Sequence, residues 1–274
     1  MIMQIPDKLK ERLEKLGLNE SIYQHRSKKC ILSREPLALE KIPWYDHAYF
    51  IPENFSAKGK FIFDPVSIVP CLALAPKKSD RILDMCAAPG TKTFILSFLT
   101  NNEAHITAND INKFRVRRLR FNVEKFSLSV DVTNMSGRKI EGTFDKILLD
   151  APCTGEGMVN KKEKLFANWS ENSVRFLSRK QKKLITHAFK LLAPGGTLVY
   201  STCTFEPDEN EAVVDFLLRK SDAVIESVDV NIRHADGITE WNKPLDKRLS
   251  ACMRIYPQHN GTGGFFVAKI RKLL

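Results

Sequence analysis

Two cysteines of this chain each follow a short apolar run. Cys203 comes after residues 197–202, Thr-Leu-Val-Tyr-Ser-Thr, and Cys153 comes after residues 147–152, Ile-Leu-Leu-Asp-Ala-Pro. Such runs are typical of buried strands, and open α/β sheets bind ligands just beyond the carboxyl ends of their strands. A thiolate there can bond covalently to a substrate. A cysteine in an apolar run is more often an inert core residue, and the run alone leaves both interpretations open.

A second pattern could hold a nucleoside-containing cofactor. Residues 84–93, Asp-Met-Cys-Ala-Ala-Pro-Gly-Thr-Lys-Thr, lead from an apolar run into a helical pattern, and small residues let the backbone approach a ligand at the helix N-terminus. Asp110 stands 20 residues after Gly90, where an acid can accept hydrogen bonds from ribose hydroxyls. An ordinary strand–helix turn and a helix-capping aspartate would give the same features.

A third candidate is Asp150, which stands at the end of an apolar run and before Pro152 and Cys153. A carboxylate in this position could accept a hydrogen bond from the amino group of a nucleobase. The proline could equally do no more than end the strand, because it cannot donate to the ladder of a sheet.

Alternating strands and helices must position these residues. We expect strands at residues 81–84, 105–110, 130–134, 144–150, 197–201, 254–256 and 265–270. We expect helices at residues 7–16, 68–74, 91–100, 113–126, 173–192 and 208–220. This alternation implies a mostly parallel, doubly wound α/β sheet.

Two helices carry more detailed predictions, and the chain divides into two parts. In the helix at 173–192 we expect one buried face, formed by Phe176, Leu177, Leu184, Ile185, Ala188 and Leu192. In the helix at 208–220 we expect Asp208 as the N-cap and Glu211 in the capping-box position. Residues 1–59 are irregular beyond their first helix and form a small N-terminal appendage, whereas residues 60–274 form the main domain.

Composition is that of a globular chain. Of the 274 residues, 43% are hydrophobic and 27% are charged, and no run approaches the roughly 18 apolar residues of a membrane span. The first residues soon become charged and lack the apolar stretch of a signal peptide, so we expect a cytoplasmic protein with no membrane partner. The six cysteines form no Cys-x-x-Cys pair and no zinc-type cluster, so we expect neither a disulfide framework nor a metal site.

The net charge of +11 favours a polyanionic partner such as nucleic acid, or reflects a merely basic surface. The basic clusters are Arg115, Arg117, Arg118 and Arg120; Lys161, Lys162 and Lys164; and Arg179, Lys180, Lys182 and Lys183. A charge cluster is usually a solvated face. Residues 155–172 are the best candidate for RNA contact, because Phe166 and Trp169 could stack on an extruded base. Trp169 could equally belong to the core.

Three stretches in this order, residues 84–93, 150–153 and 201–203, resemble signature motifs of the RNA (cytosine-5) methyltransferases of the Sun (NSUN) family. The similarity runs from about residue 60 to the C-terminus, and the appendage and the loop after Cys153 resemble archaeal members that modify tRNA. The resemblance implies a class I methyltransferase with a Rossmann-like, mostly parallel seven-stranded sheet flanked by helices. It implies S-adenosylmethionine as cofactor and methylation of cytosine C5 in RNA, above all tRNA. The alternatives are an rRNA substrate, or a non-catalytic RNA-binding factor that keeps the fold.

The resemblance also assigns roles to single residues. Cys203 matches the nucleophile that bonds to cytosine C6, and Cys153 matches the residue that assists release of the methylated RNA, whereas DNA cytosine-5 methyltransferases use the Pro-Cys cysteine as nucleophile. The implied catalytic residues are Cys203, Cys153, Asp150 and Lys92. The implied cofactor-binding residues are Cys86, Ala87, Ala88, Pro89, Gly90, Thr91, Lys92, Asp110, Arg115 and Asp150.

The chain departs from the family pattern at three places. Ser136-Gly137-Arg138 stands where the family has an aspartate near the adenine, so a carboxylate contact to adenine is in doubt. Phe63 replaces a glutamine, and the Arg-x-Asn-Thr stretch of family N-termini is absent. We therefore expect an altered RNA-facing side of the appendage.

Overall fold

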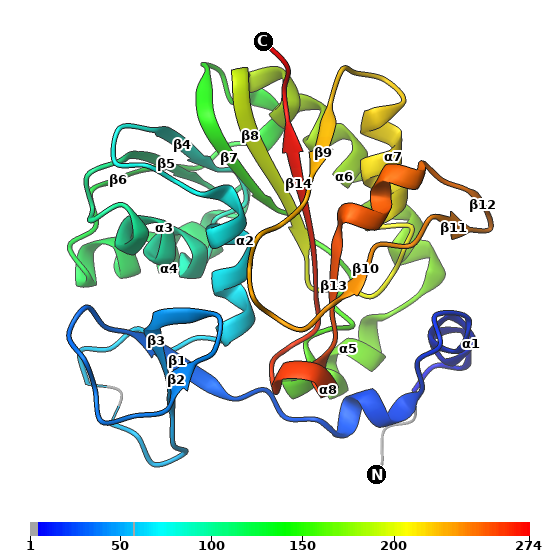
Figure 1. The fold of residues 1–274 in the computed structure, drawn as a ribbon, viewed down its shortest axis with the longest axis horizontal. Helices are drawn as coiled ribbons and strands as arrows, with labels where there is room; N and C mark the ends of the chain where they lie inside the picture. The colour runs from blue at the N-terminus through cyan, green and yellow to red at the C-terminus, as the bar shows by residue number, and fades with distance from the viewer. Residues whose placement is uncertain (1–4, 57) are drawn as a thin grey trace.

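A mixed sheet forms the centre of the molecule, and helices cover both of its faces (Figure 1). The computed structural model describes residues 5–56 and 58–274, and residues 161–164 without their side chains. The parallel part of the sheet contains, in spatial order, β6 (Val130–Thr133), β5 (His105–Asn109), β4 (Arg81–Asp84), β7 (Phe144–Asp150) and β8 (Leu192–Thr202). This confirms the α/β, Rossmann-like fold and the five strands expected in this part of the chain.

The central parallel strands β4, β7 and β8 are buried on both faces, which explains their continuous apolar runs. Successive side chains of a strand point to opposite faces. Ile82 and Leu148 accordingly pack in one core cluster, whereas Leu83 and Leu149 pack in the other. Burial on both sides fixes the register of β4 and β7, and with it the positions of the residues that follow them.

The other part of the sheet is antiparallel, and here the predicted number of seven strands is wrong. β14 (Phe265–Arg271) pairs with β8, and its free edge is shared by β13 (Met253–Ile255) and β9 (Val224–Glu226). β10 (Ala235–Asp236) then pairs with β13. The sheet has nine strands because two short strands fill its seventh position and a third extends it. Strands of two or three residues are too short for alternation to reveal.

The helices lie in two groups. On one face of the sheet lie α2 (Ile68–Leu74), α3 (Thr91–Leu99) and α4 (Lys113–Lys125), within two residues of their predicted ends. On the opposite face lie α6 (Glu171–Leu191) and α7 (Glu211–Leu218). Both groups cover the sheet, as a doubly wound fold requires.

The buried face of α6 agrees with the predicted one only in part: Ile185 and Ala188 are buried as expected, but other expected residues are not. Phe176 is 55% exposed, and Leu192 already belongs to β8. The buried face instead includes Ser178 and Gln181, which donate hydrogen bonds to the backbone of Asp208 and to the Glu209 carboxyl. An apolar pattern cannot detect a face whose central residues are polar and satisfied by distant partners.

The start of α7 also differs from the predicted start at residue 208. The helix begins at Glu211, with Asn210 in the N-cap position. Asp208 pairs with Arg12, and Glu211 forms a buried ion pair with Arg254 at 2.6 Å instead of completing a capping box. A buried guanidinium needs a carboxylate partner, and this long-range need determines the local structure here.

The N-terminal part contains a small sheet that the sequence did not predict. After α1 (Asp7–Lys15) and the 3₁₀ helix η1 (Glu20–Gln24), β1 (Lys29–Leu32), β2 (Lys41–Ile42) and β3 (Tyr45–Ile51) form an antiparallel sheet in the order β1-β3-β2. Helix α1 confirms the predicted first helix, with Leu9 and Leu13 buried. Cys30 of β1 forms an isolated β-bridge with Phe63, which lies beyond the predicted boundary at residues 59 and 60. That boundary stays a prediction.

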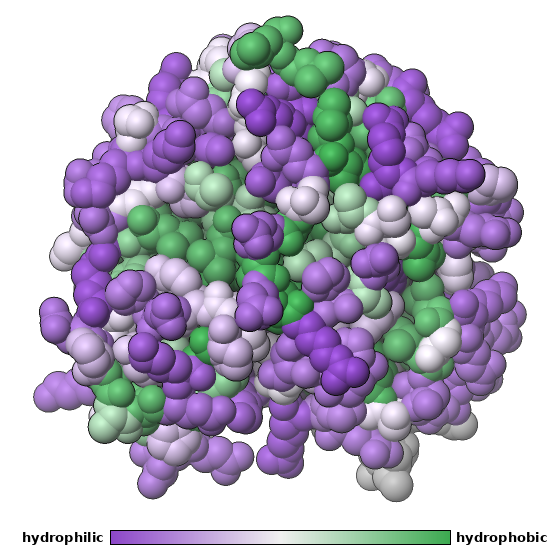
Figure 2. Space-filling model, in the orientation of Figure 1, coloured by the Kyte–Doolittle hydropathy of each residue, from purple (hydrophilic) through white to green (hydrophobic). Residues whose placement is uncertain are grey.

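Short elements connect the larger ones. They are the 3₁₀ helices η2 (Pro65–Ser67), η3 (Gly137–Lys139), η4 (Val159–Lys161) and η5 (Lys247–Ala251), the helices α5 (Lys162–Asn168) and α8 (Pro257–Asn260), and the strands β11 (Glu240–Trp241) and β12 (Lys243–Pro244). Figure 2 shows hydrophilic side chains over most of one face of the molecule, with apolar side chains exposed in patches between them. Among the described residues, no helix is long and apolar enough to cross a membrane.

Candidate active site

The two cysteines lie side by side at the carboxyl edge of the sheet. Strands β7 and β8 are parallel neighbours in which Asp150 pairs with Ser201, so the next residues of both strands continue together. Three residues after Asp150 and two after Ser201, the Sγ atoms of Cys153 and Cys203 lie 3.3 Å apart, within hydrogen-bond range for sulfur. This contact and burial both raise the pKa of the Cys153 thiol well above its ordinary value. All six cysteines of the chain are free thiols.

A partly buried ion pair lies at the same edge. The Lys92 ammonium on α3 donates to the Asp150 carboxylate at 2.7 Å, and the Ser201 hydroxyl donates to its other oxygen at 3.0 Å. Burial alone lowers the pKa of Lys92, but the attraction of Asp150 outweighs burial and raises it, so the lysine keeps its charge. The same ammonium interacts electrostatically with Cys203 and lies 4.9 Å from the centre of the Phe265 ring. A thiolate at Cys203 would therefore lie near a fixed positive charge.

The loop between β4 and α3 forms a tight backbone turn. Gly90 has a φ of +107°, and a Cβ there would lie 3.0 Å from Leu119, so only glycine fits without strain. The Thr93 hydroxyl donates to the buried Asp84 carboxyl at 2.7 Å. The Ala87 amide donates to the carbonyl of Asn109 at 2.7 Å. These bonds hold residues 85–90 at the N-terminus of α3, where backbone amides favour an anionic or polar ligand.

Asp110 lies beside this loop and retains an unused acceptor. Its carboxylate is buried, and one oxygen accepts a hydrogen bond from the Asn112 amide at 2.9 Å. The other oxygen accepts no hydrogen bond, although the Arg115 guanidinium lies 3.3 Å away. Arg115 also donates to the carbonyl of Ala88 in the loop. A buried acceptor without a donor is a place where a ligand hydroxyl fits.

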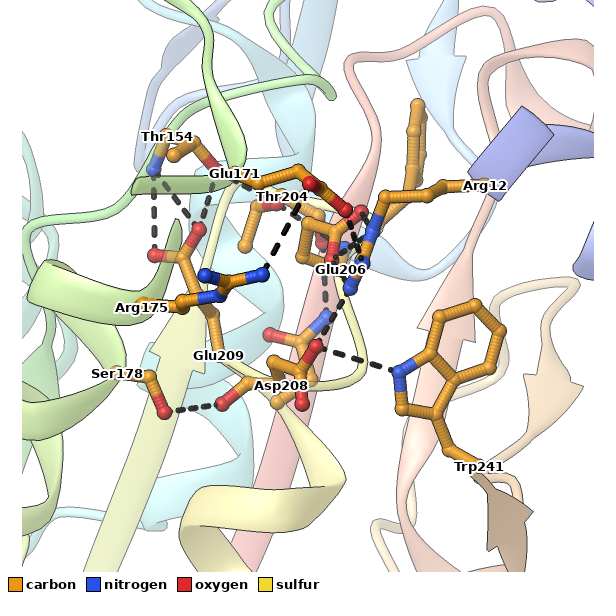
Figure 3. A network of polar contacts seen from close by, with 12 residues as sticks. Arg12, Thr154, Glu171, Arg175, Ser178, Thr204, Glu206, Asp208, Glu209 and Trp241 are labelled. Atoms are coloured by element: carbon orange, nitrogen blue, oxygen red, sulfur yellow. Dashed lines mark hydrogen bonds and ion pairs between the residues drawn. The ribbon is translucent and has the colours of Figure 1, made fainter. Parts of the chain in front are cut away.

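A buried carboxyl cluster lies behind the two cysteines, and the sequence did not reveal it. Thr154 and Thr204 each follow one of the cysteines, and both hydroxyls bond to Glu156. The Thr154 hydroxyl and amide also donate to Glu209 (Figure 3). Glu209 in turn accepts a hydrogen bond from Gln181 of α6. A hydroxyl has one proton and cannot donate to Glu156 and Glu209 at once, so one of the two carboxyls must carry a proton itself.

Helix α1 supplies a guanidinium to this region. Arg12 of α1 donates to Glu206 at 2.7 Å and to Asp208 at 2.5 Å, and it lies 5.3 Å from the Trp241 ring (Figure 3). Burial alone lowers the pKa of Arg12, but its two carboxylate partners outweigh burial and raise it. Helix α1 is thereby fastened to the segment that directly follows Cys203.

The sequence contained one signal for this network. Residues 206–211, Glu-Pro-Asp-Glu-Asn-Glu, are strongly acidic, yet they stand between an apolar strand and an apolar helix. Buried carboxyls in such a segment require cations or protons from elsewhere in the chain. The partners Arg12, Gln181 and Arg254 are far away in the sequence, and no spacing rule identifies them.

The aromatic residues of the loop after Cys153 are not available for stacking. Trp169 is buried and donates its indole hydrogen bond to Glu156, and Phe166 packs edge-on against Tyr23 at 4.9 Å between ring centres. Both belong to the core, which corrects their proposed role on an extruded base. The predicted basic cluster Lys161, Lys162 and Lys164 lies outside the described side chains.

The structure shows where the residues that depart from the family pattern lie. Gly137 packs η3 against α6, since a Cβ there would lie 2.9 Å from Leu184. Phe63 is buried and exchanges backbone hydrogen bonds with Cys30. Within residues 5–56 and 58–274, no group of three His, Cys, Asp or Glu side chains could hold a metal ion.

Stability should decrease as pH rises toward neutrality, because of the buried carboxyls. Burial raises the pKa of Glu209 to about 7 against the lowering effect of its hydrogen bonds, and the charges of Glu206 add to this rise. Burial likewise raises the pKa of Asp84 to about 7. An unfolded chain ionises Glu209 near its ordinary value of 4.5, so the folded state holds the extra proton between these pH values. The stability that each protonated carboxyl contributes is fully present below its pKa in the unfolded chain. It is lost as the pH rises through its pKa in the folded chain, by up to about 1.4 kcal/mol per pH unit.

The variant Glu209→Gln tests this expectation. It removes the titrating group and keeps a neutral side chain of the same shape, so the free energy of unfolding should decrease less steeply with pH than in the native chain. Urea unfolding at a series of pH values from 4.5 to 8 measures both slopes. The exposed Glu141→Gln variant is the control and should follow the native slope. Equal slopes for all three proteins would contradict a titrating buried Glu209.

Sequence comparison places the chain among known methyltransferases. The family model described as 16S rRNA methyltransferase RsmB/F matches residues 71–271. A tRNA (cytosine(49)-C(5))-methyltransferase of Pyrococcus abyssi is 40% identical over 256 residues, which cover 88% of this chain and 82% of the relative. Ribosomal RNA small subunit methyltransferase F of Escherichia coli K12 is 37% identical, over 85% of this chain and 52% of the relative. The chain thus spans about half the length of the bacterial enzyme.

Solved structures agree with this placement. A methyltransferase homologue from Pyrococcus horikoshii superimposes with a TM-score of 0.81 at 28% identity, over 98% of this chain and all of that one. NSun6 from Pyrococcus horikoshii, solved with the S-adenosylmethionine analogue SFG, superimposes with a TM-score of 0.70 at 34% identity, over 82% of this chain and 57% of that one. Together with the three motifs, these matches establish that the chain belongs to the RsmB/F family of methyltransferases, as its resemblance to the Sun family implied.

Proposed function

We propose that this chain methylates cytosine C5 in RNA, with S-adenosylmethionine as methyl donor and Cys203 as covalent nucleophile. One observation carries the proposal: two thiols 3.3 Å apart follow neighbouring parallel strands, beside an ion pair between the buried Lys92 and the half-buried Asp150. A cysteine at either strand end alone could be an inert core residue. Two adjacent thiols at the ligand-binding edge, with a cation nearby, favour chemistry.

The two thiols suit a reaction that both forms and breaks a covalent bond. Cytosine C5 is a poor nucleophile, and the Cys203 thiolate overcomes this by bonding to C6, which moves the electron pair of the C5–C6 double bond onto C5. C5 then accepts a methyl group. Loss of the C5 proton restores the double bond and expels the Cys203 thiolate. Cys153, in contact with the Cys203 sulfur, lies where it can take part in this release.

Asp150 and Lys92 position the reacting groups. The Asp150 carboxylate, held by Lys92 and Ser201, can accept a hydrogen bond from the amino group of the target cytosine. Lys92 keeps its charge in a buried place and attracts a thiolate at Cys203. Fixed charges in such a site act more strongly than in water, because no solvent has to reorganise around them.

The loop after β4 and Asp110 fit S-adenosylmethionine. The free acceptor of Asp110 suits a ribose hydroxyl, and residues 86–92 bring backbone amides to the N-terminus of α3. Arg115 links the Asp110 carboxylate to the loop. When bound, this cofactor supplies a methyl group on a positively charged sulfur, which a carbon nucleophile can attack. No carboxylate stands at residues 136–138, so adenine would be held there by apolar and backbone contacts.

tRNA is the substrate we propose, on the basis of the archaeal relative. That relative is named for cytosine 49 of tRNA and matches this chain over most of both lengths. An rRNA substrate is the alternative, because the Escherichia coli relative is named for ribosomal RNA. That enzyme is nearly twice as long as the part matched here, so its additional residues have no counterpart in this comparison.

A methylation assay tests the proposal. Purified protein, methyl-labelled S-adenosylmethionine and either a tRNA transcript or a small-subunit rRNA transcript should give 5-methylcytosine in the tRNA, identified by mass spectrometry of nucleosides. Calorimetry should show cofactor binding in the absence of RNA. Label found only in the rRNA would mean that rRNA, and not tRNA, is the substrate. RNA binding without cofactor binding would favour a non-catalytic factor.

A further inference from the structure

Helix α4 presents an outward face that none of the roles described so far uses. Its 13 residues include six cations and a single acid, Glu124. Val116 and Leu119 are buried against the sheet, whereas Phe114 and Phe121 are 63% and 61% exposed. Exposed apolar side chains that stand together often mark a binding surface, whereas single ones are ordinary. On α4 these two rings stand among six cations within 13 residues, which calls for a physical explanation.

The exposed residues form one stripe in which aromatic and basic side chains alternate. Phe114, Arg117, Phe121 and Lys125 follow each other at spacings of three and four residues, so they share one side of the helix. The Arg117 guanidinium lies 5.7 Å from the centre of the Phe114 ring, and the Lys125 ammonium lies 5.8 Å from that of Phe121. Arg118 lies next to this stripe on the exposed side. The α4 stripe, defined as these five residues, is therefore both cationic and aromatic.

Among the side chains that the structure describes, none is a carboxylate partner of the cations of the α4 stripe. Among the described residues, Arg115 is the one α4 cation in an ion pair, with Asp110. Elsewhere in the chain, arginines such as Arg12, Arg219 and Arg254 pair with acids. Unpaired cations on a rigid helix retain their full attraction for an anionic ligand.

The α4 stripe borders a hollow that reaches the cofactor loop. The hollow has a volume of about 600 Å³, and its lining includes Lys60, Arg118, Phe121 and Lys125, together with Pro89 and Thr91 of the loop between β4 and α3. A strand of nucleic acid lying on the stripe would therefore lead toward the edge of the sheet where Cys203 lies.

We propose that the α4 stripe and this hollow bind the RNA strand next to the target cytosine. Arg117, Arg118 and Lys125 contact phosphates, and Phe121 stacks on an unpaired base. The cationic side chains suit the phosphate charges of a single strand, and the aromatic rings between them suit its exposed bases. The inference rests on the proposed function for the identity of the ligand, but it concerns binding and can be tested without turnover.

The test compares RNA affinity over a series of salt concentrations. Fluorescence anisotropy with a labelled tRNA transcript gives the dissociation constant of the native chain and of the double variant Arg117→Ala/Arg118→Ala. The slope of log affinity against log salt should decrease by about 1.5 in the variant, because two phosphate contacts are lost. The matched control is Arg179→Ala/Lys183→Ala, which removes the same charge from α6 on the opposite face of the sheet and should keep the native slope.

Phe121 provides a second readout. Phe121→Ala should weaken RNA binding on the order of tenfold, and it should raise the KM for RNA while kcat stays near the native value, whereas Phe121→Trp should restore affinity. S-adenosylmethionine binding by calorimetry should be unchanged in every variant. Native-like RNA affinity and salt slope in the α4 variants, equal losses in the α6 control, or no RNA binding by the native chain would each overturn the inference. RNA binding through the α4 stripe without any methylation would sustain it and refute the proposed function instead.

Discussion

Replacement of Cys203 by alanine should abolish methylation, with a loss of at least about 10⁴-fold in turnover. The variant lacks the thiolate that bonds to cytosine C6. Among the thiols that the structure describes, only Cys153 contacts this position. Without that bond C5 stays unreactive, and Lys92 and Asp150 can bind the base but cannot activate it. The measurement is label transfer from S-adenosylmethionine to the tRNA transcript under single-turnover conditions.

The same variant should leave cofactor binding intact. Cys203 lies at the end of β8, whereas the cofactor loop follows β4, so calorimetry with S-adenosylmethionine should give the native affinity. Cys203→Ser is the matched control for volume, and it should be as inactive as the alanine variant, because a hydroxyl at this position is a far weaker nucleophile. Turnover near the native rate in either variant would place the nucleophile elsewhere.

Asp150→Asn should reduce turnover on the order of 10²- to 10³-fold. The asparagine keeps the shape of the side chain but removes the charge that holds the Lys92 ammonium at 2.7 Å. A buried lysine without its carboxylate partner loses the influence that raises its pKa, so it becomes neutral more easily and attracts a thiolate less. The pH–rate profile of the variant should therefore differ from that of the native chain as well as its rate.

Ser201→Ala is the control for this prediction. It removes one hydrogen bond to Asp150 and leaves the ion pair, so its loss of activity should be about tenfold or less. A pH profile of Asp150→Asn that matches the native one, with equal losses in both variants, would mean that the carboxylate acts only as a structural acceptor.

The parts of this molecule that could be predicted from the sequence depend on local patterns. The strands β4, β5, β7 and β8 have long enough apolar runs to be identified, and their carboxyl ends placed both cysteines and Asp110 at one edge. Parallel pairing of β7 and β8 brings the segments that follow the two strands together, and Cys153 and Cys203 meet there. The motif resemblance added the roles, which spacing alone did not supply.

The features that could not be predicted from the sequence depend on contacts between residues that are far apart in the chain. Glu156 and Glu209 are buried because Trp169, Gln181 and the two threonines provide donors. Arg12 reaches the neighbouring Glu206 and Asp208 from the first helix. The N-terminal β1-β3-β2 sheet includes a strand of two residues, which no alternation can mark. Such features arise from tertiary contacts, and local propensity gives no access to them.

The most direct test of this account is the identity of the cysteine that bonds to RNA. Cys153→Ala retains the nucleophile but lacks the thiol proposed to assist release, so it should accumulate a covalent RNA complex during turnover. Digestion with protease and nuclease, followed by mass spectrometry, should find a methylated cytidine nucleotide attached to the peptide that contains Cys203, and Cys203→Ala should form no such complex. A nucleotide attached to Cys153 in the Cys203→Ala protein, with no complex in Cys153→Ala, would reverse the two roles and contradict the account.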